Sequence, residues 1–208
     1  MSSKKPNEFK KGFIISHYRF ERLIGQGGYG YIFIARNVET EQDYAMKIEK
    51  IIPNKRGLKP EIQFMPQIQG SPYFPALIES GEDATYRWIV YELLGPSLTY
   101  LRWQMHGDHF TKFTAFRCAI EMLRGIEECH NRGFIHRDIK PGNFLIRPSK
   151  RHPVVLIDFG LSRQFIVNGD IIPPRKHVGF IGTTRYASIN VYRGKEQCRG
   201  DDLVSWFY

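Results

Sequence analysis

The stretch FIHRDIKPGNFLI, residues 134–146, places polar side chains between two apolar runs. Burying an unpaired charge is costly, so such side chains are paired with each other, exposed in a loop, or positioned for a charged ligand. Asp138 and Asn143 flank a Pro-Gly pair and can turn toward one point, with Lys140 between them. Asp158 directly follows the apolar run VVLI. Two carboxylates and an amide oxygen favour a hard divalent cation such as Mg²⁺, although Asp158 could instead cap a turn.

The run GQGGYG carries glycines at Gly25, Gly27 and Gly30. The residues after Gly30 are β-branched and aromatic, so we expect the glycines at a turn between two strands and not at the start of a helix. Backbone N–H groups of such a turn can approach phosphates because no Cβ blocks them. A flexible hairpin without a ligand is the alternative.

Lys47 lies between Met46 and Ile48 in a predicted half-buried strand, where a lysine needs an anionic partner. Glu61, in the next predicted helix, is a candidate partner. The alternative is two surface charges that never meet. Pro66 falls inside the apolar pattern of that helix and is expected to bend or end it, which would loosen the pair.

The elements that must position these residues differ between the two halves of the chain. The first part reads as β-strands with one helix near residues 59–69, and the part after residue 96 is mainly helical. Apolar residues recur every three or four positions within residues 110–133, which predicts the clearest helix, ended by Gly133. The segment 161–185 has little regular pattern. The sequence therefore predicts an α+β fold with a boundary near residues 92–96.

The composition of the 208-residue chain, 42% hydrophobic and 14% aromatic, is typical of a globular protein. A formal net charge of +9 favours anionic partners, but scattered basic residues without interleaved aromatic residues disfavour nucleic acid. No run approaches the ~18 apolar residues that span a bilayer, so no membrane partner is expected. The three cysteines lack metal-ligand or redox spacing, which favours reduced thiols in the cytoplasm or nucleus.

The order of these motifs is more specific than any one of them. A glycine turn, a strand lysine, a helical glutamate, HRDIKPGN and DFG follow one another as they do in protein kinases. The chain resembles a eukaryotic protein kinase domain. ELLGPSL and GTTRYASIN resemble the casein kinase 1 superfamily, and the Pro-Pro-Arg run and DDLVSWFY resemble its tau-tubulin kinase branch.

This resemblance implies a bilobal fold with a basic N-terminal tail over residues 1–17, a β-rich nucleotide-binding lobe over residues 18–92 and a helical lobe over residues 93–208. A kinase domain of this kind runs on for roughly another 80–100 residues, as the resemblance implies, so the helical lobe is expected to be incomplete. The apolar residues near residue 208 would then lack a cover.

The resemblance also implies the nucleotide site. The glycine turn, with Tyr29 at its tip, would cover the phosphates, and Lys47, held by Glu61, would contact the α- and β-phosphates. Tyr91 would close the deep end of the adenine site, where the family usually has a smaller methionine. The residues expected to bind the nucleotide are Gly25, Gly27, Gly30, Ile32, Ala45, Lys47, Glu61, Glu92 and Leu94.

The catalytic roles are implied in the same way. Asp138 would orient the substrate hydroxyl and accept its proton, and Lys140 would steady the transferring phosphoryl group. Asn143 and Asp158 would hold Mg²⁺. Thr183 would touch the catalytic loop, which is the HRDIKPGN stretch at residues 136–143. Arg185 would be the family's anion-binding arginine, which favours acidic or phosphorylated substrates.

We therefore expect a serine/threonine protein kinase that transfers the γ-phosphate of ATP, with Mg²⁺, to acidic or primed proteins. The alternative is a truncated, catalytically impaired isoform that binds a nucleotide or a partner without turnover. A cluster of Arg137, Arg163 and Arg185 near the 161–185 segment is also expected, where an anion could order them.

Overall fold

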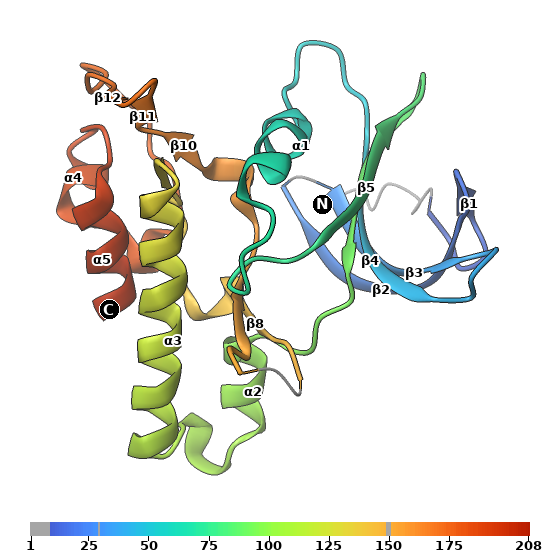
Figure 1. Cartoon of the computed structure of the whole chain (residues 1–208), viewed down its shortest axis with the longest axis horizontal. Helices are drawn as coiled ribbons and strands as arrows, with labels where there is room; N and C mark the ends of the chain where they lie inside the picture. The colour runs from blue at the N-terminus through green and yellow to red at the C-terminus, as the bar shows by residue number, and fades with distance from the viewer. Residues whose placement is uncertain (1–8, 29, 149–150) are drawn as a thin grey trace, which may run out of the picture. The chain divides into compact units, whose positions relative to one another are not determined.

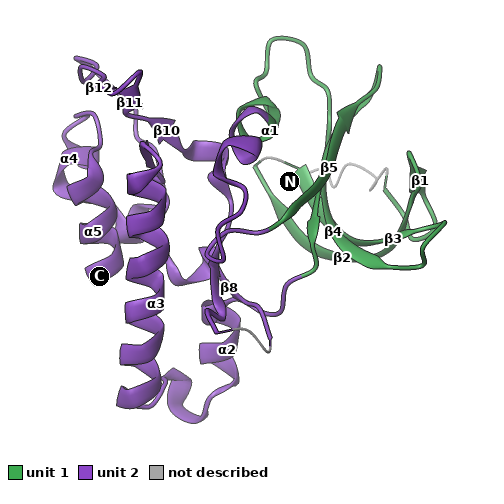
Figure 2. Ribbon diagram, in the orientation of Figure 1, with its two compact units in different colours: residues 1–62, 76–93 green, residues 63–75, 94–208 purple. Residues whose placement is uncertain are grey.

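The computed structural model describes residues 9–28, 30–148 and 151–208. The chain forms two compact units (Figure 2). Unit 1 comprises residues 1–62 and 76–93, and unit 2 comprises residues 63–75 and 94–208. Unit 1 is built on a β-sheet and unit 2 is mainly helical (Figure 1), so the predicted α+β class is confirmed.

Unit 1 contains a six-stranded antiparallel sheet in the order β1-β2-β3-β4-β6-β5. The strands are β1 (Ile14–Ile15), β2 (Tyr18–Gly27), β3 (Gly30–Asn37), β4 (Asp43–Lys50), β5 (Leu77–Glu82) and β6 (Tyr86–Glu92). Alternate residues of a strand face opposite sides of a sheet. Met46 and Ile48 are fully buried on the core face of β4, so the intervening Lys47 points to the opposite face.

The predicted helix near residues 59–69 is two elements. The α-helix α1 (Lys59–Phe64) carries Pro60 in its first turn, where a missing N–H costs nothing. The 3₁₀ helix η1 (Met65–Ile68) follows, with Pro66 at its start. The prediction that Pro66 ends the α-helix is confirmed, because proline cannot donate the hydrogen bond that would continue it.

Unit 2 is organised around the long helix α3 (Lys112–Asn131), whose N-cap Thr111 accepts a hydrogen bond from the backbone N–H of Thr114. Gly133, with φ of +81°, directly follows the helix C-cap, as predicted. The other helices are α2 (Leu98–Gln104), α4 (Ile189–Tyr192) and α5 (Arg199–Phe207). α5 packs beside α3 (Figure 1).

Short strands and single turns of 3₁₀ helix complete unit 2. Strand β7 pairs with β10, β8 with β9, and β11 with β12. These elements are η2 (His106–Asp108), β7 (Phe134–Ile135), η3 (Pro141–Asn143), β8 (Phe144–Ile146), β9 (Val154–Leu156), η4 (Phe159–Leu161), β10 (Arg163–Gln164), β11 (Ile166–Val167), β12 (Asp170–Ile171) and η5 (Thr184–Tyr186). The segment 161–185 thus contains little regular structure, as its sequence predicted.

Large apolar side chains remain exposed on α3 and α5. Phe113 and Phe116 of α3 expose 76% and 70% of their surface, and Phe207 of α5 exposes 85%. The expectation that apolar residues near residue 208 lack a cover holds for Phe207, whereas Trp206 donates a hydrogen bond to the backbone oxygen of Ala119 on α3. Within the described ranges, no helix has the length and apolar character needed to cross a bilayer.

Residues 9–17 are more structured than the sequence suggested. We expected a polar tail through residue 17, but Phe9 is 3% exposed and belongs to the core cluster of the sheet. Ile15, in β1, pairs with Tyr18 of β2. The lysines of this segment had predicted a solvated tail. The buried side chains of Phe9 and Ile15 show that part of the segment packs in the core instead. The aromatic rings nearest Phe9 are those of Phe13, Phe20, Tyr31, Phe33 and Tyr86.

We predict that Phe9→Ala destabilises the protein by about 3–5 kcal/mol, because it leaves a cavity among these rings. Urea unfolding followed by tryptophan fluorescence measures the change. Lys11→Ala is the matched control, since the Lys11 side chain is 79% exposed, and its effect should stay within about 0.5 kcal/mol. Equal stability of the two variants would show that the segment around Phe9 is not part of the core.

Candidate active site

Unit 1 brings together a lysine, a glutamate and a tyrosine from three elements. Lys47 on β4 donates from Nζ to Oε2 of Glu61 on α1 at 2.6 Å. Tyr91 on β6 donates its hydroxyl to the other carboxylate oxygen, Oε1, at 2.8 Å. The side chains of Lys47 and Glu61 are 9% and 2% exposed. Both oxygens of this buried carboxylate are therefore held, which offsets its loss of hydration.

The expectation that Pro66 loosens this pair is wrong. Glu61 lies in the first turn of α1, and Pro66 acts only after that α-helix has ended. A break beyond Phe64 leaves the backbone around Glu61 helical, so its side chain still reaches Lys47. The hydroxyl of Tyr91 is a second hydrogen-bond donor to the Glu61 carboxylate, which the sequence did not predict.

The residues expected around the adenine and the phosphates lie on neighbouring strands. Ile32 pairs with both Gly25 and Lys47 in register, and Ala45 pairs with Tyr91. A Cβ on Gly25 would lie 3.3 Å from the Ile32 side chain, so the glycine lets β2 approach closely.

The glycine turn itself depends on one residue. Gly30 has φ of +105°, and a Cβ there would lie 2.1 Å from the backbone oxygen of Ile48. Any other residue would clash, so Gly30 is required for the path of the chain. Gly27 pairs with Gly30, so β2 and β3 flank a glycine turn as predicted. Tyr29, expected at the tip, lies outside the described residues.

The two residues expected to bond the adenine lie at the end of β6. Glu92 is the last residue of the strand, and its N–H donates to the backbone oxygen of Ala76 at 3.0 Å. Leu94 is the first residue of the second segment of unit 2. Their assigned role in nucleotide binding stays a prediction.

In unit 2, Asp138 lies in a network of short hydrogen bonds. Lys140 donates from Nζ to its Oδ2 at 2.7 Å, and Thr183 donates from its hydroxyl to Oδ1 at 2.6 Å. Nδ2 of Asn143 donates to Oδ2 at 3.1 Å and to the backbone oxygen of Asp138 at 2.8 Å. Asp138 is 7% exposed. The structure thus joins the catalytic loop to Thr183, which is 45 residues later in the chain.

The expected metal ligands are linked through the main chain. The N–H of Ile157, one residue before Asp158, donates to the backbone oxygen of Asn143 at 2.9 Å. With Nδ2 of Asn143 committed to Asp138, its amide oxygen is the atom that can bind a cation. An amide oxygen and a carboxylate are hard ligands of the kind that Mg²⁺ prefers. Mg²⁺ usually takes only one or two such protein ligands and completes its shell with phosphate and water oxygens, so the side chains of Asn143 and Asp158 are chemically suited to hold it.

The backbone around Asp158 is held by the next residue, Phe159. Asp158 has φ of +67°, a left-handed conformation that is unfavourable for a residue with a Cβ. Phe159 is 1% exposed, stacks on Phe64 at 4.9 Å and meets the ring of His136 at 5.1 Å. These ring contacts oppose the backbone strain. Both ring nitrogens of His136 are hydrogen-bonded, to the oxygen of Ile157 and the N–H of Asp138, so His136 is a core histidine.

Asp202 is a functional residue that the sequence analysis missed. It lies on α5, is 2% exposed, and accepts the backbone N–H groups of His136 and Arg137, each at 2.8 Å. His130 on α3 reaches the same carboxylate at 2.9 Å. Asp202 therefore fixes the backbone just before Asp138. Its signal in the sequence is a pair of aspartates that opens an apolar helical run, where acidic residues are otherwise expensive to bury.

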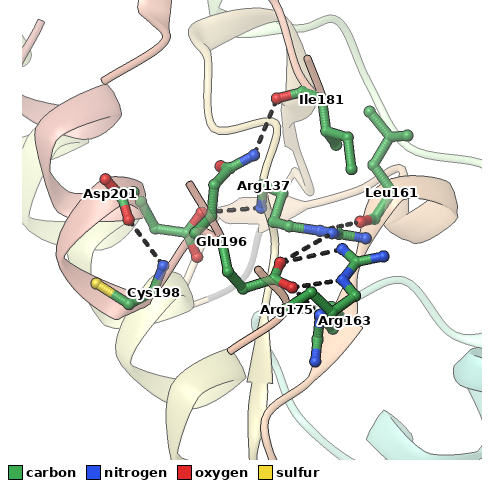
Figure 3. A network of polar contacts seen from close by, with 10 residues as sticks. Arg137, Leu161, Arg163, Arg175, Ile181, Glu196, Cys198 and Asp201 are labelled. Atoms are coloured by element: carbon green, nitrogen blue, oxygen red, sulfur yellow. Dashed lines mark hydrogen bonds and ion pairs between the residues drawn. The ribbon is translucent and has the colours of Figure 1, made fainter. Parts of the chain in front are cut away.

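The predicted arginine cluster exists with one change of member (Figure 3). Arg137 and Arg163 gather as expected, but the third guanidinium belongs to Arg175, and all three surround the carboxylate of Glu196. Arg185 instead lies exposed on η5, with its guanidinium 5.9 Å from the centre of the Tyr186 ring. The anion that the cluster required is supplied by the chain.

These geometries suit the transfer of a phosphoryl group. Such a reaction needs little covalent chemistry from the protein and depends on positioning and on neutralising charge. A buried lysine held by a glutamate can bind phosphate oxygens. A carboxylate held by a lysine, a threonine and an asparagine can orient a hydroxyl group and accept its proton.

Comparison with known proteins agrees with this chemistry. Residues 18–205 match the family described as the protein kinase domain. The chain is 39% identical over 190 residues to a Dictyostelium discoideum protein described as a probable serine/threonine-protein kinase, covering 90% of this chain and 38% of that protein.

Two Caenorhabditis elegans proteins are also similar. The serine/threonine-protein kinase spe-6 is 34% identical over 206 residues, covering 95% of this chain and 54% of that protein. A protein described as a candidate casein kinase I is 34% identical over 201 residues, covering 93% and 59%. The chain thus spans between about two fifths and three fifths of the length of these relatives. Because the match covers residues 18–205 of the 208-residue chain, the chain belongs to the protein kinase domain family.

Proposed function

We propose that this chain transfers the γ-phosphoryl group of ATP to serine or threonine side chains of protein substrates. The observation that carries this proposal is the network around Asp138. Its carboxylate is oriented by Lys140, Thr183 and Asn143 and is 7% exposed. A carboxylate held in this way can align a hydroxyl group and take its proton as the new bond to phosphorus forms.

Other residues are suited to bind the phosphates, the transferring group and the metal ion. Lys47, aligned by Glu61 and Tyr91, is suited to bind the phosphates of the nucleotide. Lys140 is suited to steady the transferring group, and its ammonium group is already held by Asp138 and Thr183. Asn143 and Asp158 would hold Mg²⁺, which, when bound with ATP, neutralises charge on the phosphate oxygens.

We further propose that the substrates are acidic or already phosphorylated proteins, and that the enzyme is closest to the tau-tubulin kinase branch of the casein kinase 1 superfamily. The exposed guanidinium of Arg185 lies two residues from Thr183 and can bind an anionic group on a substrate. The net charge of +9 favours approach of acidic proteins. Free thiols at Cys118, Cys129 and Cys198 support a reducing compartment, the cytoplasm or the nucleus.

The first prediction about activity concerns Asp138. Asp138→Asn should lower kcat by about 10²–10⁴-fold, because the amide cannot accept the substrate proton. It should leave ATP affinity nearly unchanged. Transfer of labelled phosphate to a casein-type acidic substrate and a thermal shift with Mg-ATP measure the two properties. Asp170→Asn, on exposed strand β12, is the control. If the wild-type protein binds Mg-ATP but transfers no phosphate, the chain is a binding module without turnover.

The second prediction concerns Tyr91. Tyr91→Phe removes one hydroxyl and with it the hydrogen bond to Oε1 of Glu61. A hydrogen bond to a charged group contributes enough free energy that we expect the KM for ATP to rise about tenfold. The fold should be retained, since the ring remains. Tyr100→Phe, on a side chain that is 52% exposed, should have no effect. An unchanged KM in Tyr91→Phe would mean that Lys47 alone positions Glu61.

The third prediction concerns substrate choice. Arg185→Ala should lower kcat/KM for a peptide that carries phosphoserine upstream of the target by about tenfold, through loss of a charge-assisted hydrogen bond. The value for a neutral peptide should not change. Arg117→Ala, an exposed arginine on α3, is the matched control. A parallel fall for both peptides would assign Arg185 to the general machinery and contradict a role in selecting substrates.

A further inference from the structure

The loop before helix α5, residues 193–198, holds the segment 175–181 at three points. The N–H of Val178 donates to the backbone oxygen of Gly194 at 3.0 Å. The side-chain amide of Gln197 donates to the backbone oxygen of Ile181 at 3.0 Å. Between these two contacts, Glu196 binds Arg175 through two hydrogen bonds, at 2.5 and 3.1 Å. The segment that leads to Thr183 is therefore attached to a single short loop.

The carboxylate of Glu196 also binds arginines from two other segments (Figure 3). Arg163, two residues beyond η4, donates to Oε2 of Glu196. Arg137, the neighbour of Asp138, brings Nη1 to 3.7 Å from Oε1. The Glu196 side chain is 6% exposed. One buried carboxylate thus joins the catalytic loop, the strand after the DFG motif and the segment 175–181.

The charges around Glu196 favour its ionised form. Burial raises the pKa of the Glu196 carboxyl, but the hydrogen bond from Arg175 and the charge of Arg163 outweigh burial and hold the pKa below its ordinary value. Burial lowers the pKa of Arg137 to about 10, and Glu196 opposes that change. Three guanidinium groups around one carboxylate would repel each other strongly if that carboxylate were removed.

A short path connects this cluster to Asp138. Gly182 follows Ile181 and has φ of +112°, and a Cβ there would lie 2.6 Å from the backbone oxygen of Arg137. The chain therefore crosses the catalytic loop at close range. The next residue, Thr183, donates its hydroxyl to Asp138. The placement of residues 175–181 thus decides whether Thr183 can reach the catalytic carboxylate.

In kinases that are switched on by phosphorylation, a phosphate added to this region pairs with arginines and orders the segment. We propose that Glu196 is a positioning residue that supplies this anion from within the chain, so that the segment 175–183 is ordered without phosphorylation. The proposal rests on the proposed kinase activity for its catalytic consequence, but the ordering itself can be measured without activity.

The decisive experiment removes the charge of Glu196 and measures the segment directly. In Glu196→Gln, hydrogen–deuterium exchange of peptides covering residues 172–183 should become faster, while that of α3 stays at the wild-type rate. Glu128→Gln is the matched control, because Glu128 also pairs with an arginine, Arg132, but lies on α3 with a side chain that is 30% exposed. Unchanged exchange over residues 172–183 in Glu196→Gln would overturn the proposal.

An added anion separates a charge effect from a purely structural one. Glu196→Ala leaves three guanidinium groups without their carboxylate, so millimolar sulfate should restore slow exchange over residues 172–183. Chloride at matched ionic strength should not restore it. The wild-type protein and Glu128→Gln should not respond to sulfate, which controls for the general stabilising effect of this salt. An equal response of the wild-type protein, or no response of Glu196→Ala, would contradict the inference.

Kinetics give the catalytic consequence. Glu196→Gln should lower kcat by about ten- to a hundredfold, the range that corresponds to loss of a hydrogen bond between charged groups. The KM for ATP should change by less than about twofold, since the groups that bind nucleotide in unit 1 are untouched. Sulfate should raise kcat in Glu196→Ala, and Glu196→Asp should keep an intermediate kcat.

Two outcomes distinguish failure of this inference from failure of the proposed function. If the wild-type protein transfers no phosphate, the proposed function fails, but the exchange and sulfate measurements still test Glu196. If the wild-type protein is active and Glu196→Gln keeps both its kcat and its slow exchange, the inference alone fails. Should the Glu196 variants not fold, Arg175→Gln removes the ion pair between Glu196 and the segment 175–181 and should also speed exchange over residues 172–183. The Arg175 side chain is 51% exposed, so the fold should tolerate this substitution. Unchanged exchange in Arg175→Gln would contradict the inference.

Discussion

The geometry of unit 2 depends on burying negative charge without leaving it unpaired. Asp202 is almost fully buried and uses both carboxylate oxygens to hold the main chain at His136 and Arg137. Arg137 has φ of +68°, a strained conformation for a residue with a side chain. The two hydrogen bonds from its neighbourhood to Asp202 offset that strain and set the direction in which Asp138 leaves the loop. Without this buried carboxylate the polar network around Asp138 would lose its support.

The same principle recurs at Glu61 and Glu196. Each carboxylate lies away from water, and each is held by partners from more than one segment. A carboxylate buried without partners would be protonated or would unfold its surroundings. Because each is fully engaged, it can act as a joint between segments that are far apart in the sequence. The residues of the candidate active site are thus positioned by charge pairing as well as by the apolar core.

Much of the fold and of the candidate site could be predicted from the sequence, because the type and neighbours of some residues are enough to predict their structural role. The alternation around Lys47 predicted a lysine on a strand that needed an anion, and Glu61 provides it. The glycine at position 30 predicted a turn, and its left-handed backbone explains why no other residue fits. The end of the α-helix before Pro66 followed from the missing N–H of proline.

Other features could not be predicted because they depend on contacts between distant segments. Local composition does not predict that the Tyr91 hydroxyl bonds to Glu61. It also does not predict that Arg175, and not Arg185, pairs with Glu196. Phe9 was misjudged because lysines surround it, although its own ring is buried. Asp202 has its two backbone partners, His136 and Arg137, in a segment 66 and 65 residues earlier in the chain. In each case the missing information was a contact with a residue far away in the sequence.

The hydroxyl of Tyr91 has a consequence for attempts to reshape this part of unit 1 by mutation. Replacing Tyr91 with glycine or alanine would open space beside Glu61. Here that replacement would remove the ring and also one of the two groups that hold Glu61. We expect the added space to come with a less firmly held Glu61, so a variant enlarged at this position would need a replacement hydrogen-bond donor elsewhere on β6 or α1.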